Sequence, residues 1–356
     1  MNDKYKVIGI MSGTSLDGVD IAYCEFSHEN EWSFQLLHAE TVSYDEHWKK
    51  NLGEIHRGSA EMISETDSAY GNFLGKLVKD FCEKHKLSPD FISSHGHTVF
   101  HQPQKGYTRQ IGSGAHLSAH AGFPVICDFR SSDVALGGQG APLVPVGDKY
   151  LFADADYCLN LGGIANISYD ENNERLAFDI CACNLVLNYY ALKKGHPFDR
   201  NGQIAASGNK SIVLLNKLNN LPYYSKAFPK SLGREDVEKN VVSLIDQFEL
   251  SVEDVLSTFC EHIALQIAKV TGVEKKQKKM LVTGGGALNT FLLNCIFKNS
   301  DVAIIIPKKE IIEFKEAIIF AFLGVLRMRK EINCLKTVTG ARLNSCGGAI
   351  YYPFEK

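Results

Sequence analysis

Several features that would place this chain in a specialised class are missing from its 356 residues. Proline accounts for 10 residues, and the ten cysteines include no Cys-x-x-Cys pair, so neither a proline-rich linker nor a zinc ribbon is indicated. Lysine and arginine number 38 against 41 aspartates and glutamates, which leaves no positive field for nucleic acid or an anionic membrane. The longest apolar run, residues 317–326, is shorter than the roughly 20 residues that span a bilayer. We therefore expect no nucleic-acid or membrane partner, and reduced, buried thiols in a cytoplasmic protein.

What the chain does contain is an ordinary globular composition, 45% hydrophobic and 22% charged, with 30 glycines. Its length favours two domains. Glycine that is not accompanied by proline favours turns in which the backbone approaches another group closely. The positions of these glycines therefore guide the search for a site.

The two halves of the chain open with similar patterns. Strands are predicted at 5–11, 19–26 and 32–39 in the first half, and at 156–161, 164–169 and 175–179 in the second. Helical periodicity predicts long helices at 61–86, 251–270 and 313–329. Each half thus combines a three-stranded meander with helix–strand units. The predicted class is α/β with mixed sheets and a weak internal duplication.

The first candidate site is the turn Met-Ser-Gly-Thr-Ser-Leu-Asp-Gly-Val-Asp at 11–20, between two predicted strands. Its small residues expose backbone N–H and hydroxyl donors, which suit a polyphosphate. Asp17 is a candidate for holding Mg²⁺ through water. The turn is not a Walker loop, because Gly-Lys-Ser/Thr is absent and a strand is predicted next. A plain hairpin turn is the alternative, although it would need only two or three residues.

Two further glycine motifs follow predicted strands in the second half. Asn-Leu-Gly-Gly-Ile-Ala-Asn (160–166) occupies the place equivalent to the first turn, although a Gly-Gly pair by itself also fits a β-bulge. Val-Thr-Gly-Gly-Gly-Ala-Leu-Asn (282–289) lets the backbone approach a flat ligand beside a helix N-terminus, and it lacks the dinucleotide fingerprint. We interpret residues 282–289 as a binding site for adenosine or phosphate. Residues 160–166 are interpreted as the side of a nucleotide clamp that opposes the turn at 11–20.

Asp179 lies at the end of a predicted strand in a hydrophobic setting. Partial burial would raise the pKa of its carboxyl group toward the working range of a general base. The alternative is that Asp179 caps the next helix, a role for which Asn184 is also well placed. A general-base role for Asp179 is therefore a hypothesis.

Histidines occur at 95, 97 and 101, close to a predicted strand end. Their spacing, with Gly96 among them, does not fit the helical histidine pair of zinc proteases. We interpret His95 and His97 as part of a polar loop that faces a substrate. Arg130, in Asp-Phe-Arg (128–130), suits a substrate carboxylate because its guanidinium is a planar fork.

With these motifs, the sequence resembles the anhydro-N-acetylmuramic acid kinase family of the actin, sugar kinase and heat-shock ATPase superfamily. The resemblance runs from about residue 7 to residue 353. Besides the motifs above, it is carried by Ser-His-Gly-His-Thr-Val-Phe-His (94–101), Ala-Leu-Gly-Gly-Gln-Gly-Ala-Pro-Leu-Val-Pro (135–145), Pro-Lys-Ser-Leu-Gly-Arg-Glu (229–235), Lys-Glu-Ala (315–317) and Val-Thr-Gly-Ala (338–341).

The resemblance implies two ribonuclease-H-like lobes with mixed sheets flanked by helices, lobe I being residues 1–135 with 340–356 and lobe II residues 136–339. It implies a cytoplasmic, dimeric kinase of peptidoglycan recycling. Such an enzyme uses ATP, Mg²⁺ and water to open 1,6-anhydro-N-acetylmuramic acid and phosphorylate its O6. The product is N-acetylmuramic acid 6-phosphate.

The resemblance also implies roles for individual residues. Asp179 matches the catalytic aspartate, which deprotonates the attacking water, and Glu316 matches an acidic residue near the sugar. His95, His97 and Arg130 are the residues expected to bind the sugar. The residues expected to bind nucleotide are Gly13, Thr14, Ser15, Leu16, Asp17, Gly18, Val19, Asp20, Gly162, Gly163, Asn166, Gly284, Gly285, Gly286 and Asn289.

The sequence departs from the family close to the chemistry. Ile-Cys-Ala-Cys-Asn (180–184) stands where the family has Thr-Gly-Pro-Gly-Asn, Asn188 replaces an acidic residue, and His97 replaces a glutamine found in many members. Alternatives therefore include a catalytically altered paralogue and a kinase for another sugar. A non-kinase actin-like ATPase and a glycosidase are further alternatives, although a glycosidase would leave the glycine motifs without a purpose.

Overall fold

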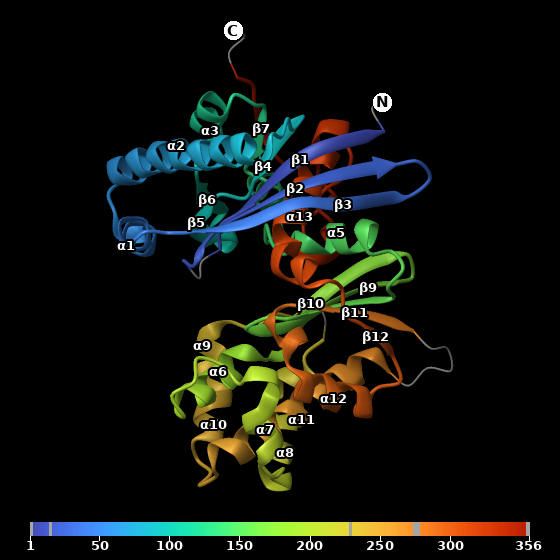
Figure 1. The fold of residues 1–356 in the computed structure, drawn as a ribbon. Helices are drawn as coiled ribbons and strands as arrows, with labels where there is room; N and C mark the ends of the chain where they lie inside the picture. The colour runs from blue at the N-terminus through green and yellow to red at the C-terminus, as the bar shows by residue number, and fades with distance from the viewer. Residues whose placement is uncertain (1–2, 14–15, 228–229, 273–277, 354–356) are drawn as a thin grey trace. The chain divides into compact units, whose positions relative to one another are not determined.

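The computed structural model describes residues 3–13, 16–227, 230–272 and 278–353, and the chain divides into two compact units (Figure 1). Unit 1 comprises Met1–Leu151 and Phe314–Lys356, and unit 2 comprises Phe152–Glu313. These units begin and end elsewhere than the expected lobes, whose boundaries were placed at 135/136 and 339/340. The segment after residue 135 stays with unit 1 because the buried Asp133 carboxylate accepts hydrogen bonds from the Gly140 N–H and the Thr339 hydroxyl.

The sheet of unit 1 has the strand order β13-β7-β4-β1-β2-β3. β1, β2 and β3 form an antiparallel meander, β4 runs parallel to β1, and β7 runs parallel to β4. The antiparallel edge strand β13 pairs with β7. The strands are β1 Lys4–Met11, β2 Gly18–His28, β3 Trp32–Ser43, β4 Phe91–Ser94, β7 Val125–Cys127 and β13 Ala349–Tyr351.

The longest helix of unit 1, α2, runs over Ala60–His85 and covers this sheet together with α3. Its hydrophobic residues recur every three or four positions, so one face carries Tyr70, Leu74, Val78 and Phe81 into the core. The Ser59 hydroxyl caps its start by accepting the Met62 N–H. The other elements are α1 Glu46–Glu54, α3 Gly114–Ala121, α4 Ser131–Ala135, α5 Val144–Leu151, α13 Lys309–Arg329, α14 Lys336–Thr339 and the hairpin β5 His97–Gln102 with β6 Tyr107–Ile111.

The sheet of unit 2 has the order β10-β9-β8-β11-β12, again an antiparallel meander followed by two parallel strands. Unit 1 has the same order in β3-β2-β1-β4-β7. This repeat confirms the predicted mixed α/β class and the internal duplication of a ribonuclease-H-like arrangement. The strands are β8 Tyr157–Leu161, β9 Ile164–Glu171, β10 Glu174–Ala182, β11 Lys279–Thr283 and β12 Ala303–Ile305.

The helix α11, Val252–Thr271, is the longest helix within unit 2 and lies at the centre of its core. It follows Ser251, whose hydroxyl accepts the Asp254 N–H, and ends at Gly272, close to the predicted range of 251–270. The other helices are α6 Asn184–Leu192, α7 Gln203–Ser207, α8 Ile212–Asn219, α9 Arg234–Asp236, α10 Ser243–Ile245 and α12 Thr290–Asn299. Within the described residues, none of the helices combines the length and apolarity that a bilayer crossing requires.

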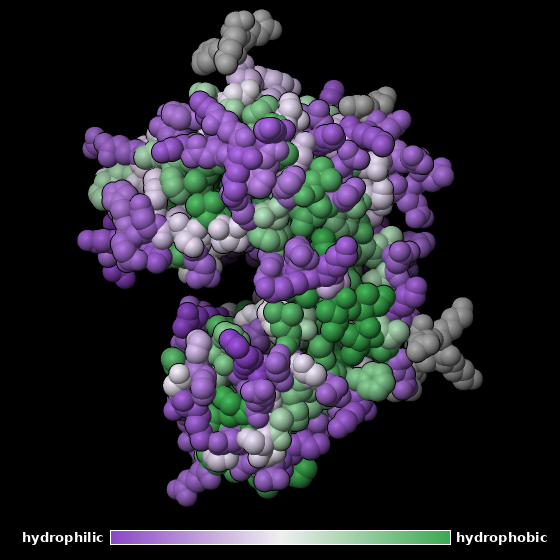
Figure 2. All heavy atoms as spheres, in the orientation of Figure 1, coloured by the Kyte–Doolittle hydropathy of each residue, from purple (hydrophilic) through white to green (hydrophobic). Residues whose placement is uncertain are grey.

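Two local differences from the sequence-based expectation lie beside the candidate site. His97 begins strand β5, whereas residues 94–98 were expected to form a loop. Strand β10 continues past Asp179 to Ala182, with a shift in register between Asp179 and Cys181. Such bulges redirect side chains and are common beside active sites. Figure 2 shows one face of the molecule, on which hydrophobic residues gather over β11 and β12 of unit 2.

Candidate active site

A row of polar side chains crosses the sheet of unit 2 and ends at Asp179. Asp179 of β10 lies opposite Asn166 of β9, and Asn166 lies opposite Asn160 of β8. Residues directly opposite one another in antiparallel strands share a face of the sheet. The three side chains therefore line one face. Asn160 was not among the predicted site residues, although its position across a short glycine turn from Asn166 is visible in the sequence.

Asp179 is held by a segment that lies beside strand β10. The Leu232 N–H donates to Oδ2 of Asp179 at 2.9 Å, and the Asp179 N–H donates to the Lys230 carbonyl at 3.2 Å. The Tyr223 hydroxyl donates to the Asp179 carbonyl at 2.6 Å. Burial raises the pKa of the half-buried Asp179 carboxyl group, and the Leu232 N–H opposes that rise. One carboxylate oxygen is thus fixed, and the group is a stronger base than an exposed aspartate.

The divergent residues after Asp179 point into the protein core. Ile180, Cys181, Ala182 and Cys183 are all at most 2% exposed and belong to the hydrophobic cluster of unit 2. Burial raises the pKa of the Cys181 thiol and raises that of Cys183 to about 12. Both thiols are therefore neutral, and neither is a nucleophile at neutral pH. This placement agrees with the expectation of buried thiols.

The two glycine motifs of unit 2 contact each other at the end of β8. Gly284 has a φ of 78°, and a Cβ there would lie 2.5 Å from Oδ1 of Asn160. A Cβ on Gly286 would lie 2.6 Å from the Leu161 side chain. The close approach requires glycine at both positions. The motif continues as a 3₁₀ turn, Gly285–Leu288, and α12 begins only after Asn289, whose side chain accepts the Leu292 N–H.

Asn184, which was not among the predicted site residues, joins these motifs to helix α6. Its side-chain amide donates to the Leu161 carbonyl at 2.8 Å, and its backbone N–H donates to the Gly162 carbonyl at 3.1 Å. The N-cap of α6 is Cys183, so neither Asp179 nor Asn184 caps this helix. Asn184 is also the one position at which residues 180–184 match the Thr-Gly-Pro-Gly-Asn segment of the family that the sequence resembles.

The first turn lies in unit 1 between β1 and β2. Thr14 and Ser15 lie outside the described residues. Leu16 adopts a φ of 60°, Asp17 is exposed, and a Cβ on Gly18 would overlap the Val42 carbonyl. Val19 is buried in the strand, so its backbone alone could face a ligand. The Asp20 carboxylate accepts a hydrogen bond from the Thr41 hydroxyl at 2.5 Å.

A second charged group in unit 1 centres on Arg130. Its guanidinium donates to Nε2 of His95 at 2.9 Å and to the Gly140 carbonyl at 2.6 Å. Glu316, on α13, keeps solvent exposure, yet the protein atoms around its carboxyl group displace water and raise its pKa, and Arg130 opposes that rise. Asp20 adds to the rise. The structure thus brings His95, Arg130, Glu316 and Asp20 into one electrostatic group.

His97 and His101 do not take part in the hydrogen bonds of Arg130. His97 is 4% exposed; burial lowers its pKa, and the Leu52 backbone opposes that fall. Nδ1 of His101 pairs with the Thr108 hydroxyl at 3.1 Å across the β5–β6 hairpin. Among the described residues, no group of three or more histidine, cysteine, aspartate or glutamate side chains could hold a metal ion.

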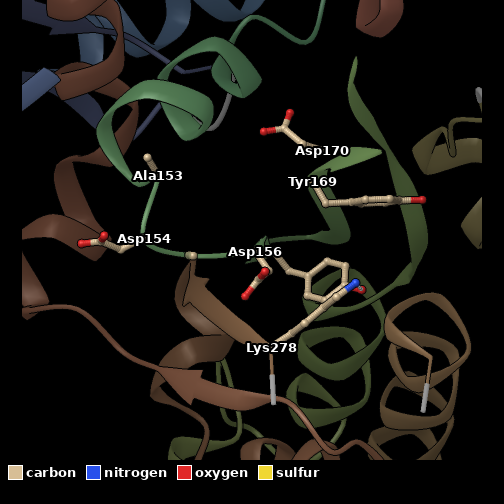
Figure 3. A pocket seen from close by; sticks show the side chains of 8 residues that line it. Ala153, Asp154, Asp156, Tyr169, Asp170 and Lys278 are labelled. Atoms are coloured by element: carbon tan, nitrogen blue, oxygen red, sulfur yellow. Dashed lines mark hydrogen bonds between the residues drawn. The ribbon is translucent and has the colours of Figure 1, made fainter. Parts of the chain in front are cut away.

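A polar cavity of about 220 Å³ lies at the opposite end of β8 from the glycine motifs (Figure 3). Asp154, Asp156, Asp170 and Lys278 line it, with Tyr157 and Tyr169. The Lys278 ammonium donates to the Tyr157 hydroxyl at 3.2 Å, and Asp156 accepts the Lys279 N–H at 2.8 Å. The predicted site residues do not line this cavity.

The sequence comparisons agree on one family. A sequence profile described as "Anhydro-N-acetylmuramic acid kinase" matches residues 5–353. A relative of that name from Shewanella denitrificans is 34% identical, with 97% of each chain covered. Another from Sulfurovum is 33% identical, with 98% of this chain and 99% of the relative covered. A third, from Haemophilus influenzae, is 32% identical, with 97% of each covered.

The solved structures that resemble this chain are more distant. One is the "Activator of the 2-Hydroxyisocaproyl-CoA Dehydratase from Clostridium difficile with bound ADPNP", at 14% identity and a TM-score of 0.42, covering 91% of this chain and 97% of that one. Another is component A of (R)-2-hydroxyglutaryl-CoA dehydratase from Acidaminococcus fermentans, at 13% identity and a TM-score of 0.44, covering 89% and 96%. These scores are too low to bear on function.

Proposed function

The chain belongs to the anhydro-N-acetylmuramic acid kinase family, and from this premise we propose that it uses ATP and water to open 1,6-anhydro-N-acetylmuramic acid and phosphorylate O6. The observation that carries the proposal is the Asp179 carboxyl group, half-buried, with a raised pKa and one oxygen fixed by the Leu232 N–H. A carboxylate of this kind is suited to take a proton from water near neutral pH.

In the proposed reaction, Asp179 accepts a proton from a water molecule whose oxygen attacks the anomeric carbon. The bond from that carbon to O6 breaks, and O6 takes the γ-phosphoryl group of ATP, which releases ADP. Phosphoryl transfer of this kind depends on positioning and charge neutralisation more than on covalent chemistry by the protein. The hydrogen bonds from Leu232 and Tyr223 supply positioning at Asp179.

Glycine-rich backbone is proposed to supply the nucleotide contacts. In unit 2, Gly284–Gly286 pack so closely against the end of β8 that side chains would not fit there. Backbone without side chains also lets a ligand approach closely. In unit 1, the sequence of the turn at 13–20 is proposed to supply backbone donors for phosphate oxygens, with residues 14 and 15 lying outside the described residues. The exposed Asp17 carboxylate has the ligand chemistry that Mg²⁺ prefers, and Mg²⁺ would neutralise phosphate charge there.

The sugar is proposed to contact the charged group of unit 1. Arg130 provides a planar donor fork for the lactyl carboxylate, and Glu316 provides an acceptor for sugar hydroxyls. His97 is also proposed to contact the sugar. These assignments rest on the family resemblance together with the placement of Arg130 and Glu316.

The burial of residues 180–183 favours an active enzyme over a catalytically altered paralogue. Their side chains enter the core, so the substitutions change packing behind the strand while the Asp179 carboxylate keeps its hydrogen bond to Leu232. We further propose, from the family resemblance, a homodimer that acts in the cytoplasm in peptidoglycan recycling. Light scattering of the purified protein tests the dimer directly.

The test of the function is an acceptor-dependent assay. The protein is incubated with ATP, Mg²⁺ and 1,6-anhydro-N-acetylmuramic acid, and ADP release and sugar phosphate are followed, the latter by phosphorus NMR. We expect stoichiometric ADP and sugar 6-phosphate. ATP hydrolysis that is independent of sugar would indicate a non-kinase ATPase, ring opening without ATP a glycosidase, and nucleotide binding without product an altered paralogue.

A further inference from the structure

His95 lies in the turn between β4 and β5, and both of its ring nitrogens make hydrogen bonds. Nδ1 lies 2.8 Å from the Gly96 carbonyl oxygen, and Nε2 lies 2.9 Å from Nη2 and 3.2 Å from Nε of Arg130. A carbonyl oxygen can only accept and a guanidinium can only donate. The proton of the neutral ring therefore sits on Nδ1, and Nε2 presents its lone pair to Arg130.

The surroundings of the ring keep this tautomer fixed. The Gly96 carbonyl also accepts the Ser12 hydroxyl at 2.8 Å, which anchors the acceptor of the Nδ1 proton. The ring is 6% exposed and packs against Phe320, with ring centroids 4.7 Å apart. Burial and the Arg130 charge lower the pKa of His95 to about 3, so the ring is neutral in neutral solution. No polar ring atom is left for a sugar.

Arg130 is held on a second side by the loop that follows it. Its Nη1 donates to the Gly140 carbonyl at 2.6 Å, and the Gly140 N–H donates to the buried Asp133 carboxylate at 2.7 Å. A guanidinium has five N–H groups. Within the described residues, three of these N–H groups donate hydrogen bonds, two to His95 and one to Gly140. One N–H remains on each terminal nitrogen, the number that a bidentate carboxylate contact needs.

We propose that His95 is a positioning residue, which as the Nδ1–H tautomer holds the guanidinium of Arg130 so that its two remaining N–H groups face a substrate carboxylate. His95 thus acts on the sugar through Arg130 and does not touch it. This inference rests on the proposed function for the identity of the carboxylate, and on the geometry of unit 1 for everything else.

The first experiment measures binding of the anhydrosugar by calorimetry to the full chain and to two variants. His95→Leu removes the acceptor and should weaken sugar binding at least about 10-fold, the usual scale of a hydrogen bond to a charged group. His95→Gln retains an acceptor oxygen and should recover most of the loss. Affinity for an ATP analogue should stay the same in both. Equal loss of sugar and nucleotide binding in both variants would overturn the proposal.

A double-mutant cycle separates positioning from general destabilisation. In an Arg130→Ala background, His95→Leu should have little further effect on sugar binding, because the group that His95 positions is gone. Additive effects would contradict the proposal. The matched control is His262→Leu, since His262 is also buried, neutral and hydrogen-bonded, to Tyr224 and Asn219 in unit 2. This variant should lose stability without a selective loss of sugar affinity.

The second experiment does not depend on any substrate. Long-range ¹⁵N NMR of histidine-labelled protein, assigned with His95→Gln, should show His95 as the Nδ1–H tautomer without titration between pH 5 and 8. In the His95→Leu variant, the Arg130 Nε–H should exchange with water faster than in the parent. An Nε2–H tautomer or a titrating ring refutes the positioning role. If the sugar fails to bind but this signature is present, the proposed function fails and the positioning role stands.

Discussion

Replacing Asp179 with asparagine changes the proposed base and little else. Asparagine has the same shape, and its side-chain oxygen can still accept the Leu232 N–H that fixes the carboxylate at 2.9 Å. The backbone hydrogen bonds from Tyr223 and to Lys230 do not involve the side chain. The variant therefore isolates the capacity to take a proton from water.

The magnitude follows from the role of a general base. Removal of such a group typically costs about 10²- to 10⁴-fold in rate, which is about 2.7 to 5.4 kcal/mol in activation free energy. Stability should not fall. Because burial raises the pKa of Asp179 in the folded protein, its ionised form costs folding free energy above its pKa in the unfolded chain, and asparagine removes that cost.

The assay is sugar-dependent ADP release, with binding of an ATP analogue and the thermal midpoint measured in parallel. The control is Glu174→Gln, an exposed carboxylate at the start of the same strand, which should retain full activity. In the parent enzyme, kcat/KM should fall on the acid side with an apparent pKa above the ordinary aspartate value of about 3.9. Turnover that survives Asp179→Asn within a few-fold, at intact nucleotide binding, refutes the assignment of the base.

Three further changes test the surroundings of the site. Tyr223→Phe removes the 2.6 Å hydrogen bond to the Asp179 carbonyl and should lower kcat about 3- to 10-fold with the KM for ATP unchanged; an unchanged kcat would show that Tyr223 does not position the base. Asp148→Asn breaks the buried 2.7 Å ion pair with Lys315 and should cost about 3 to 5 kcal/mol in urea unfolding, whereas a loss below 1 kcal/mol would place the pair in effective contact with water. Gly284→Ala adds a Cβ at a positive φ against the end of β8 and should raise the KM for ATP more than it lowers kcat. An unchanged KM would show that Gly284 does not belong to the nucleotide-binding site.

Much of the secondary structure was predictable because its signals are local. The strands β1 and β8 and the helices α2 and α11 lie within a residue or two of their predicted ranges. Each has an apolar pattern or a capping residue that is visible over a few neighbouring positions. The repeated meander followed from the same signals, and the sheet order of both units confirms it.

The elements that were missed depend on distant partners. The β5 strand has a polar sequence, and it forms because it pairs with β6 from His97↔Ile111 to Gln102↔Tyr107. The extension of β10 beyond Asp179 depends on Ile180, Cys181 and Ala182 entering the core of unit 2. The division into units depends on contacts distant in sequence, such as the hydrogen bond from Thr339 to Asp133, 206 residues away in the chain.

The sequence by itself determined the two glycine-marked halves and the family, because motif residues and hydrophobic periodicity can be read along the chain. It also led to the hypothesis that Asp179 is the base, which stays a prediction. The tertiary structure decided what those residues contact. His95 and Arg130 are 35 residues apart, and only folding makes the histidine an acceptor for the guanidinium and leaves it no nitrogen for a sugar. The role of a polar side chain depends on which donors and acceptors surround it when water is excluded, and those neighbours come from separate elements.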